Sequence, residues 1–195
     1  NMVFDFIYHE HLSYFSIIPL VSFFKKFGIK LVKVEHVGTK GGSLRYYWAK
    51  ESSSRPVDAS VPQFTAEEEK AGMSTDFFKQ YENRIDRVKK ELLDILETHK
   101  GQKIFGYGAS ATSTTMISHF GLEKHLTTLI DDNPGKIGTF SPGYHIPVKS
   151  FDFLLKNPPD VIVILAWRFH KQIIEKLESL NCKVIVPLPE IKVLK

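Results

Sequence analysis

Lys103-Ile104-Phe105-Gly106-Tyr107-Gly108-Ala109-Ser110-Ala111 is the stretch that decides the fold of this chain. It reads as a strand, a Gly-x-Gly-x-x-Ala turn and the start of a helix. In this pattern Gly106 permits a tight turn, and Gly108 lets a ligand approach the backbone. Ser110 lies next to the first amides of the helix, which suit an anion. The stretch favours a nucleotide-type α/β domain, with a purely structural strand–helix turn as the alternative.

Strand and helix patterns alternate from this turn to the end of the chain. The uninterrupted apolar run at residues 161–165 is typical of a strand buried on both faces, as in a parallel sheet covered by helices. The predicted fold class is α/β, with a small Rossmann-like, doubly wound parallel sheet. Strands are expected at residues 103–107, 126–131, 160–166 and 183–186, and helices at residues 111–120, 151–156 and 171–180.

Ligands of open α/β sheets bind beyond the carboxyl ends of the strands. Asp131 ends the second strand about twenty residues after the turn, where a ribose-binding acid commonly lies. Asn133 follows it. Trp167 and Arg168 follow the third strand, where an indole can stack on a base, with a packing lid as the alternative, and a guanidinium can pair with phosphate. The pattern does not distinguish NAD, a methyl donor and a nucleotide sugar. The candidate binding residues of this region are Gly106, Gly108, Ser110, Asp131, Asn133 and Trp167.

The first half of the chain has a different organisation. A helix that ends near Gly28, a strand at residues 29–37, a Gly-Gly turn and a strand at residues 43–49 are typical of the tail of a larger α/β domain. A long helix with one apolar stripe is expected at residues 75–99. We therefore predict three segments: a domain tail at residues 1–60, a linker and long helix at residues 61–100, and the Rossmann-like domain at residues 101–195.

Residues 51–64 read as a linker, because they are rich in serine and proline. Residues 65–68, Thr-Ala-Glu-Glu, have the capping-box form, in which a hydroxyl and a glutamate satisfy free amides at the start of a helix. The sequence thus predicts that a helix begins near Thr65.

Tyr8-His9-Glu10-His11 is the densest chemical segment of the chain. On an extended strand Tyr8 and Glu10 would face away from the two histidines, whereas in a helical turn Tyr8 and His11 would share a face. A metal site is disfavoured, because no second ligand motif accompanies the cluster. Acid–base chemistry suits histidine, which titrates near neutrality. A polar loop is the alternative, and spacing alone does not rank the two.

Composition excludes several classes of protein. The chain has 195 residues, 26 basic and 22 acidic side chains, and a net charge of +4 that is spread along it. A nucleic-acid-binding arm and a membrane-spanning segment are therefore not expected. A single cysteine, Cys182, makes a disulfide framework impossible within the chain, so we expect a cytoplasmic protein.

Taken together, these segments resemble the sugar C-methyltransferases that act on nucleotide-linked deoxysugars. The matching pieces occur in the order of that family and cover nearly the whole chain. One departure is Lys40, which stands where the family usually has histidine before Gly-Gly-Ser. The matching pieces are residues 4–16, 41–45, 106–111, 131–136, 142–147 and 165–167.

The resemblance implies methylation of a sugar carbon next to a ketone, on a 4-keto nucleotide-deoxysugar of the dTDP type, with S-adenosylmethionine as methyl donor. It gives His11 the role of the base, Tyr8 that of a donor to the enolate oxygen, and Glu10 that of orienting the histidine. A second group of residues would lie near the sugar nucleotide. For Arg45 of this group, a structural salt bridge is the alternative role. This group is Gly42, Ser43 and Arg45.

Members of this family have a zinc-binding domain, a central methyltransferase domain and a C-terminal Rossmann-like domain. The match places residues 1–60 at the end of the central domain, so the S-adenosylmethionine and zinc sites are expected outside this chain. The chain alone is then expected to be inactive, and to self-associate or to need an N-terminal half. The alternatives are a non-catalytic nucleotide or nucleotide-sugar binding module and a fragment of an NAD-binding oxidoreductase.

Overall fold

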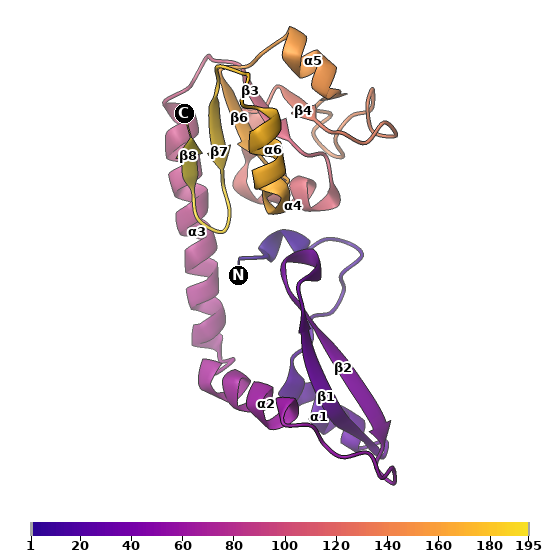
Figure 1. The fold of residues 1–195 in the computed structure, drawn as a ribbon. Coiled ribbons are helices and arrows are strands. Elements are labelled where there is room, and N and C mark those ends of the chain that lie inside the picture. The colour runs from indigo at the N-terminus through magenta and orange to yellow at the C-terminus, as the bar shows by residue number, and fades with distance from the viewer. Residues whose placement is uncertain (1, 195) are drawn as a thin grey trace. The chain divides into compact units, whose positions relative to one another are not determined.

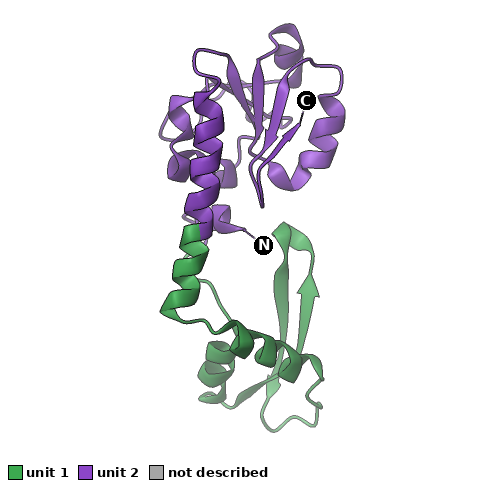
Figure 2. Cartoon of the chain, turned by 90° about the vertical axis from the view of Figure 1, so that its left-hand side faces the viewer, with its two compact units in different colours: residues 1, 12–83 green, residues 2–11, 84–195 purple. Residues whose placement is uncertain are grey.

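The computed structural model describes residues 2–194. Its internal contacts divide the chain into two compact units, which are coloured separately in Figure 2. Residues 12–83 form what we call the hairpin unit, and residues 2–11 together with 84–194 form the sheet unit. The short opening segment therefore packs with the second half of the chain, although it lies at the start of the sequence.

The sheet unit is built on a six-stranded sheet with the order β5-β4-β3-β6-β7-β8. All neighbouring pairs are parallel except β7 and β8, which are antiparallel. This is the order of a doubly wound nucleotide-binding fold, so the predicted fold class is confirmed. The strands, of which all but β5 are labelled in Figure 1, are β3 (Ile104–Tyr107), β4 (Thr128–Ile130), β5 (Val148–Lys149), β6 (Val161–Ile164), β7 (Lys183–Val186) and β8 (Lys192–Leu194).

The order of the strands reverses between β3 and β6. Because parallel crossovers are right-handed, α4 and α6 cover opposite faces of the sheet. The central strands are accordingly buried along their whole length. The helices of this unit are α4 (Ala111–Phe120), α5 (Phe151–Lys156), α6 (His170–Lys176) and the second part of α3 (Thr75–Glu97).

Sequence patterns located most elements of this unit, and α4, α5 and β7 have the predicted limits. They missed the two edge strands. β5 has only two residues and follows a loop rich in glycine and proline, and β8 has only three residues, Lys-Val-Leu. Edge strands of this kind are short and polar, so they carry no apolar run for a pattern to detect.

The long helix α3 presents one apolar stripe, as predicted. Ile85, Val88, Leu92 and Leu96 are its buried residues, and they belong to the sheet unit. Phe78, which the sequence pattern placed on the same stripe, is 54% exposed and belongs to the hairpin unit.

The hairpin unit pairs β1 and β2 antiparallel, with helices α1 and α2 packed on β1. Its core is formed by Ile17, Leu31 and Val34, against which the aromatic side chains of β2 pack. The predicted hairpin is thereby confirmed. The elements are α1 (Ile17–Lys25), β1 (Ile29–Val37), η2 (Thr39–Gly41), β2 (Ser43–Lys50), α2 (Ser60–Ala71) and the first part of α3.

The predicted helix start at Thr65 is wrong, because α2 already begins at Ser60 within the expected linker. The Thr65 hydroxyl donates to the carbonyl of Val61, one helical turn earlier. The Glu68 carboxylate accepts hydrogen bonds from the amides of Ile17 and Ile18, at 2.6 and 3.1 Å. Glu68 therefore satisfies free amides of a helix start, as expected of a capping glutamate, but those of α1 rather than of its own helix.

The opening segment is a single turn of 3₁₀ helix, η1 (Phe4–Phe6), in which Phe4 and Asp5 are buried. Within residues 2–194, every helix falls short of the length and apolarity that a bilayer crossing requires. The predicted assignment of residues 1–60 to a methyltransferase domain concerns longer family proteins, and it stays a prediction.

Candidate functional site

The opening segment is anchored by a buried carboxylate. Asp5 has no exposed surface, and Arg168 forms a two-pronged ion pair with it through Nη1–Oδ2 at 2.9 Å and Nη2–Oδ1 at 2.7 Å. Trp167 Nε1 donates to the same Oδ2 at 2.9 Å. Both partners lie just beyond the carboxyl end of β6. The start of the chain is therefore tied to the edge of the sheet at which ligands of this fold class bind.

Above this ion pair the side chains form a continuous stack. The Arg168 guanidinium lies against the rings of both Trp167 and Phe6, 4.2 and 4.3 Å from their centroids. The His11 ring is nearly parallel to that of Phe6, with an interplanar angle of 4° and a centroid distance of 5.6 Å. The Tyr8 ring in turn stacks on the ring of His11, at a centroid distance of 4.5 Å. We call Trp167, Arg168, Phe6, His11 and Tyr8 the aromatic column.

The four polar residues of the opening cluster separate into two pairs. The amide of His11 donates to the carbonyl of Tyr8 at 2.9 Å, so the chain turns there and the two rings share a face. His9 and Glu10 point to solvent, with side chains 83% and 69% exposed, and His9 Nε2 lies 3.9 Å from Glu10 Oε1. Of the two arrangements that the sequence allowed, the structure has the turn. Tyr8 and His11 are the sheltered members.

Tyr8 and His9 also line a cavity of about 680 Å³ in the sheet unit. Hydroxyl side chains of α4, from Thr114, Thr115 and Ser118, form another part of its wall. A cavity of this volume is large enough for a small organic ligand. Across the described part of the chain, no three or more His, Cys, Asp or Glu side chains gather closely enough to hold a metal ion.

The glycines of the Gly106–Ala111 turn make contacts inside the protein. A Cβ at Gly106 would lie 2.7 Å from the side chains of Leu129 and Leu165. Gly108 has a φ of +113°, and a Cβ there would lie 2.8 Å from the Cβ of Ala166. The backbone of Ala166 therefore explains glycine at position 108, whereas the contacts at Gly106 are the ends of leucine side chains.

One amide of this turn and one in the first turn of α4 are already paired with side chains. Asp131 Oδ2 accepts a hydrogen bond of 2.7 Å from the amide of Ala109, and the Ser110 hydroxyl accepts one from the amide of Ser113. The Asn133 side chain accepts from the amide of Gly135 in its own loop. Asp131, Ser110 and Asn133 therefore hold the turn and the next loop together, and they leave fewer free donors for a phosphate than the motif predicts.

A second cavity, of about 380 Å³, lies where the strand order reverses. The predicted residues Gly108, Ser110 and Asp131 line it, together with the charged side chains of Lys136 and Lys176. Lys136 pairs with Asp131 at 3.2 Å, and Lys176 pairs with Asp132 at 2.8 Å. The charges that would attract a nucleotide are thus balanced by neighbouring carboxylates.

Tyr107 closes the floor of this cavity. Its hydroxyl donates to both oxygens of Asp132, at 3.0 and 3.1 Å. Burial raises the pKa of the Tyr107 phenol, and the charges of Asp132 and Asp131 raise that pKa further. The phenol consequently stays protonated in the folded protein under conditions where an exposed tyrosine ionises.

This shift predicts a loss of stability at alkaline pH. The pKa of Tyr107 is raised above its ordinary value of 10.0, so its contribution is fully present below pH 10 and is lost as the pH rises toward the folded-state pKa. We expect the free energy of unfolding, measured by urea titration, to fall above pH 10, and to fall less in Tyr107→Phe. An equal alkaline loss in both proteins would contradict this explanation.

Residues 38–189 match the family model described as the C-methyltransferase C-terminal domain. The chain belongs to this family. It is also 29% identical, over 202 residues, to the C-methyltransferase NovU of Streptomyces niveus. That match covers 100% of this chain and 48% of the relative, so the chain spans about half the length of the relative. The expected family membership is thereby confirmed.

The C-methyltransferase family match includes Gly42, Ser43 and Arg45, which belong to the hairpin unit. Gly42 has a φ of +112° at the turn before β2, and the Ser43 hydroxyl donates to the carbonyl of Thr39 at 3.3 Å. Lys40, at the position that departs from the family, has a φ of +54°.

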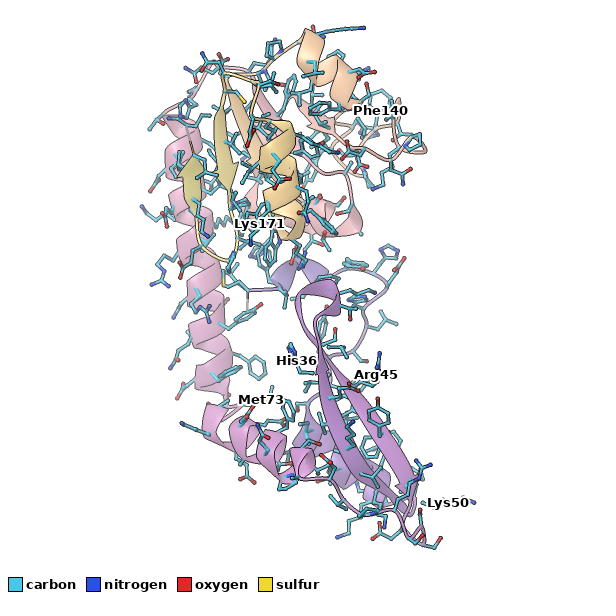
Figure 3. All side chains as sticks on the ribbon, viewed as in Figure 1. His36, Arg45, Lys50, Met73, Phe140 and Lys171 are labelled. Atoms are coloured by element: carbon cyan, nitrogen blue, oxygen red, sulfur yellow. The ribbon has the colours of Figure 1, made fainter. Side chains whose placement is uncertain are left out.

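Arg45 projects from β2 (Figure 3) and lies 3.7 Å from Glu35 of β1, the residue directly opposite in register. Tyr47 donates to Glu35 at 2.7 Å. This hydrogen bond lowers the pKa of Glu35, burial opposes the shift slightly, and the charges of Lys33 and Arg45 add to it. Arg45 therefore forms a salt bridge with Glu35, which was the alternative to a contact with the sugar nucleotide. A role for these residues in binding stays a prediction.

The predicted catalytic residues of this C-methyltransferase domain share the sheet unit with Gly106, Gly108, Ser110, Asp131, Asn133 and Trp167. Sequence reasoning missed Asp5 and Phe6, and it considered Arg168 only as a phosphate ligand. The available signal was an acidic residue inside the apolar run Val3–Ile7, since a carboxylate in such a run must find a buried partner.

Proposed function

We propose that this chain supplies the acceptor-side base of a C-methyltransferase that acts on a 4-keto nucleotide-linked deoxysugar. The observation that carries the proposal is the stacked pair of Tyr8 and His11, 4.5 Å apart, which belongs to a segment anchored at the ligand-binding edge of the sheet. The matched family supports the transferase class, and the sugar substrate comes from the resemblance of residues 4–16.

The reaction that these side chains suit begins with removal of a proton. Neutral His11 takes the proton from the carbon next to the ketone, and the electrons of the C–H bond move into an enolate. The Tyr8 hydroxyl donates a hydrogen bond to the enolate oxygen, where negative charge develops. The enolate carbon is then the nucleophile for methylation. The resemblance assigns Glu10 the role of orienting the histidine. In the structure its carboxylate lies 3.9 Å from His9, so a contact with His11 stays a prediction.

S-adenosylmethionine would supply the methyl group in the whole enzyme. The Gly106–Ala111 turn does not fit this nucleotide, because Asp131 already accepts from the Ala109 amide and Gly108 packs against Ala166. We therefore propose that the donor binds in the part of the whole enzyme outside this chain, in keeping with a relative of which the chain covers 48%.

Proton removal can be measured without the methyl donor. We expect the chain to bind dTDP and a dTDP-4-keto-deoxysugar in calorimetric titration, and to exchange the proton next to the ketone for deuterium in D₂O, followed by NMR. S-adenosylmethionine should neither bind nor be consumed. Binding of the sugar nucleotide with exchange at the uncatalysed rate would contradict the proposal, and binding of NAD alone would favour the oxidoreductase alternative.

A further inference from the structure

One member of a buried ion pair lies close in sequence to His11, the proposed base. Asp5 precedes His11 by six residues and has no exposed surface, while the side chain of Arg168 is 16% exposed. A carboxylate without exposure is stable only when it is paired and hydrogen-bonded. Here both oxygens of Asp5 accept hydrogen bonds. Oδ1 accepts one from Arg168, and Oδ2 accepts one from Arg168 and one from Trp167. The segment therefore has one strongly preferred position on the sheet edge.

Arg168 is engaged through both terminal nitrogens of its guanidinium, which donate to Asp5, while its Nε is buried without a hydrogen-bond partner among the described residues. The rings of Trp167 and Phe6 also lie against the guanidinium, with centroids 4.2 and 4.3 Å away. A phosphate that took both terminal nitrogens of Arg168 would leave the buried Asp5 carboxylate without its cationic partner. The role that fits its contacts is to hold Phe6 in place.

Phe6 is the link between the ion pair and the proposed base. Its ring lies against the guanidinium at 4.3 Å, and the His11 ring is parallel to it within 4°. Stacking of this geometry favours one plane for the imidazole ring and so biases the direction of its nitrogens. Orientation of this kind matters because a small misplacement of a reacting group slows a reaction strongly.

We propose that Asp5, Arg168 and Phe6 are positioning residues, which set the orientation of His11 for proton removal. This inference rests on the proposed function in one respect, the assignment of proton removal to His11. The contacts themselves run from Asp5 through Arg168 and Phe6 to His11. Trp167, which the sequence predicts to bind substrate, has two structural contacts in this scheme. Its ring lies against Arg168 at one end of the aromatic column, and its Nε1 donates to Asp5.

The test compares Phe6→Leu and Asp5→Asn with Met2→Ala in the full chain. Phe6→Leu leaves the ion pair in place and removes the ring on which His11 stacks. We expect its maximal rate of deuterium exchange to fall about 10- to 100-fold, with little change in KM for the sugar nucleotide. Met2 is a buried anchor of the same segment, 1% exposed, outside the column. Met2→Ala should lower the melting temperature without lowering the exchange rate.

NMR of the His11 ring protons provides a readout that needs no activity. In the wild-type chain the rings of Phe6 and Tyr8 should displace these resonances, and the displacement should shrink in Phe6→Leu and in Asp5→Asn but not in Met2→Ala. If the wild-type chain shows no exchange, the proposed function fails, and the ring shifts still decide the positioning role. Wild-type ring shifts in folded Phe6→Leu would overturn the inference, as would a loss of exchange that simply follows the melting temperature in all variants.

Discussion

The His11→Gln variant is expected to lose nearly all deuterium exchange at the carbon next to the ketone. Glutamine keeps a polar side chain of similar length, but it cannot accept a proton. Removing a general base costs about 10²- to 10⁴-fold in rate, so we expect a loss of at least about 100-fold. Binding of the dTDP-sugar should persist, because this role of His11 concerns proton removal. The measurement is the NMR signal of the exchanging proton over time, at saturating sugar nucleotide.

The neighbouring histidine offers a matched control. His9 has a side chain that is 83% exposed, lies 3.9 Å from Glu10, and stands outside the aromatic column. His9→Gln should exchange deuterium at the wild-type rate. A loss in His9→Gln as large as that in His11→Gln would contradict the assignment of the base. Full exchange in His11→Gln would do the same, and it would direct attention to another group near the cavity that Tyr8 lines.

The Gly108→Ala variant is expected to destabilise the sheet unit by about 3 kcal/mol or more. Two costs add at this position. The residue has a φ of +113°, which side-chain-bearing residues rarely adopt, and the new Cβ would lie 2.8 Å from the Cβ of Ala166 and 2.9 Å from its backbone nitrogen. Neither strand can move away without breaking the hydrogen bonds between β3 and β6. Thermal unfolding followed by circular dichroism should show a melting temperature lower by roughly 6–12 °C.

Gly121→Ala separates the two costs. Gly121 ends α4 with a φ of +73°, and a Cβ there would have no atom within 4 Å. This variant should lose only about 1 kcal/mol, the cost of the backbone conformation. If Gly108→Ala proved no less stable than Gly121→Ala, the close approach to Ala166 would not be the reason for glycine. A selective loss of ligand binding in Gly108→Ala would instead favour the nucleotide-binding interpretation of the turn.

Local patterns were sufficient for the central strands and the main helices of the sheet unit, but not for its edge strands. The apolar run at residues 161–165 predicted a strand buried on both faces, and the stripe of α3 and the Gly-Gly turn before β2 were equally informative. These features follow from the repeat of the backbone itself, which places side chains on one face of a helix or on alternate faces of a strand. Glu68 shows the limit of such reasoning, since its residue type predicted a cap but not which helix it caps.

The sequence by itself determined the fold class, the order of the main strands and helices, and the residue types available for proton transfer. Only the tertiary structure decided the partners: Asp5 meets Arg168 across 163 positions, and Asp131 meets Ala109 across 22. The same residue types suited a phosphate or a ribose equally well in the sequence pattern. The choice depends on which elements pack together, because a buried charge takes the partner that the packed strands and loops bring within hydrogen-bond distance.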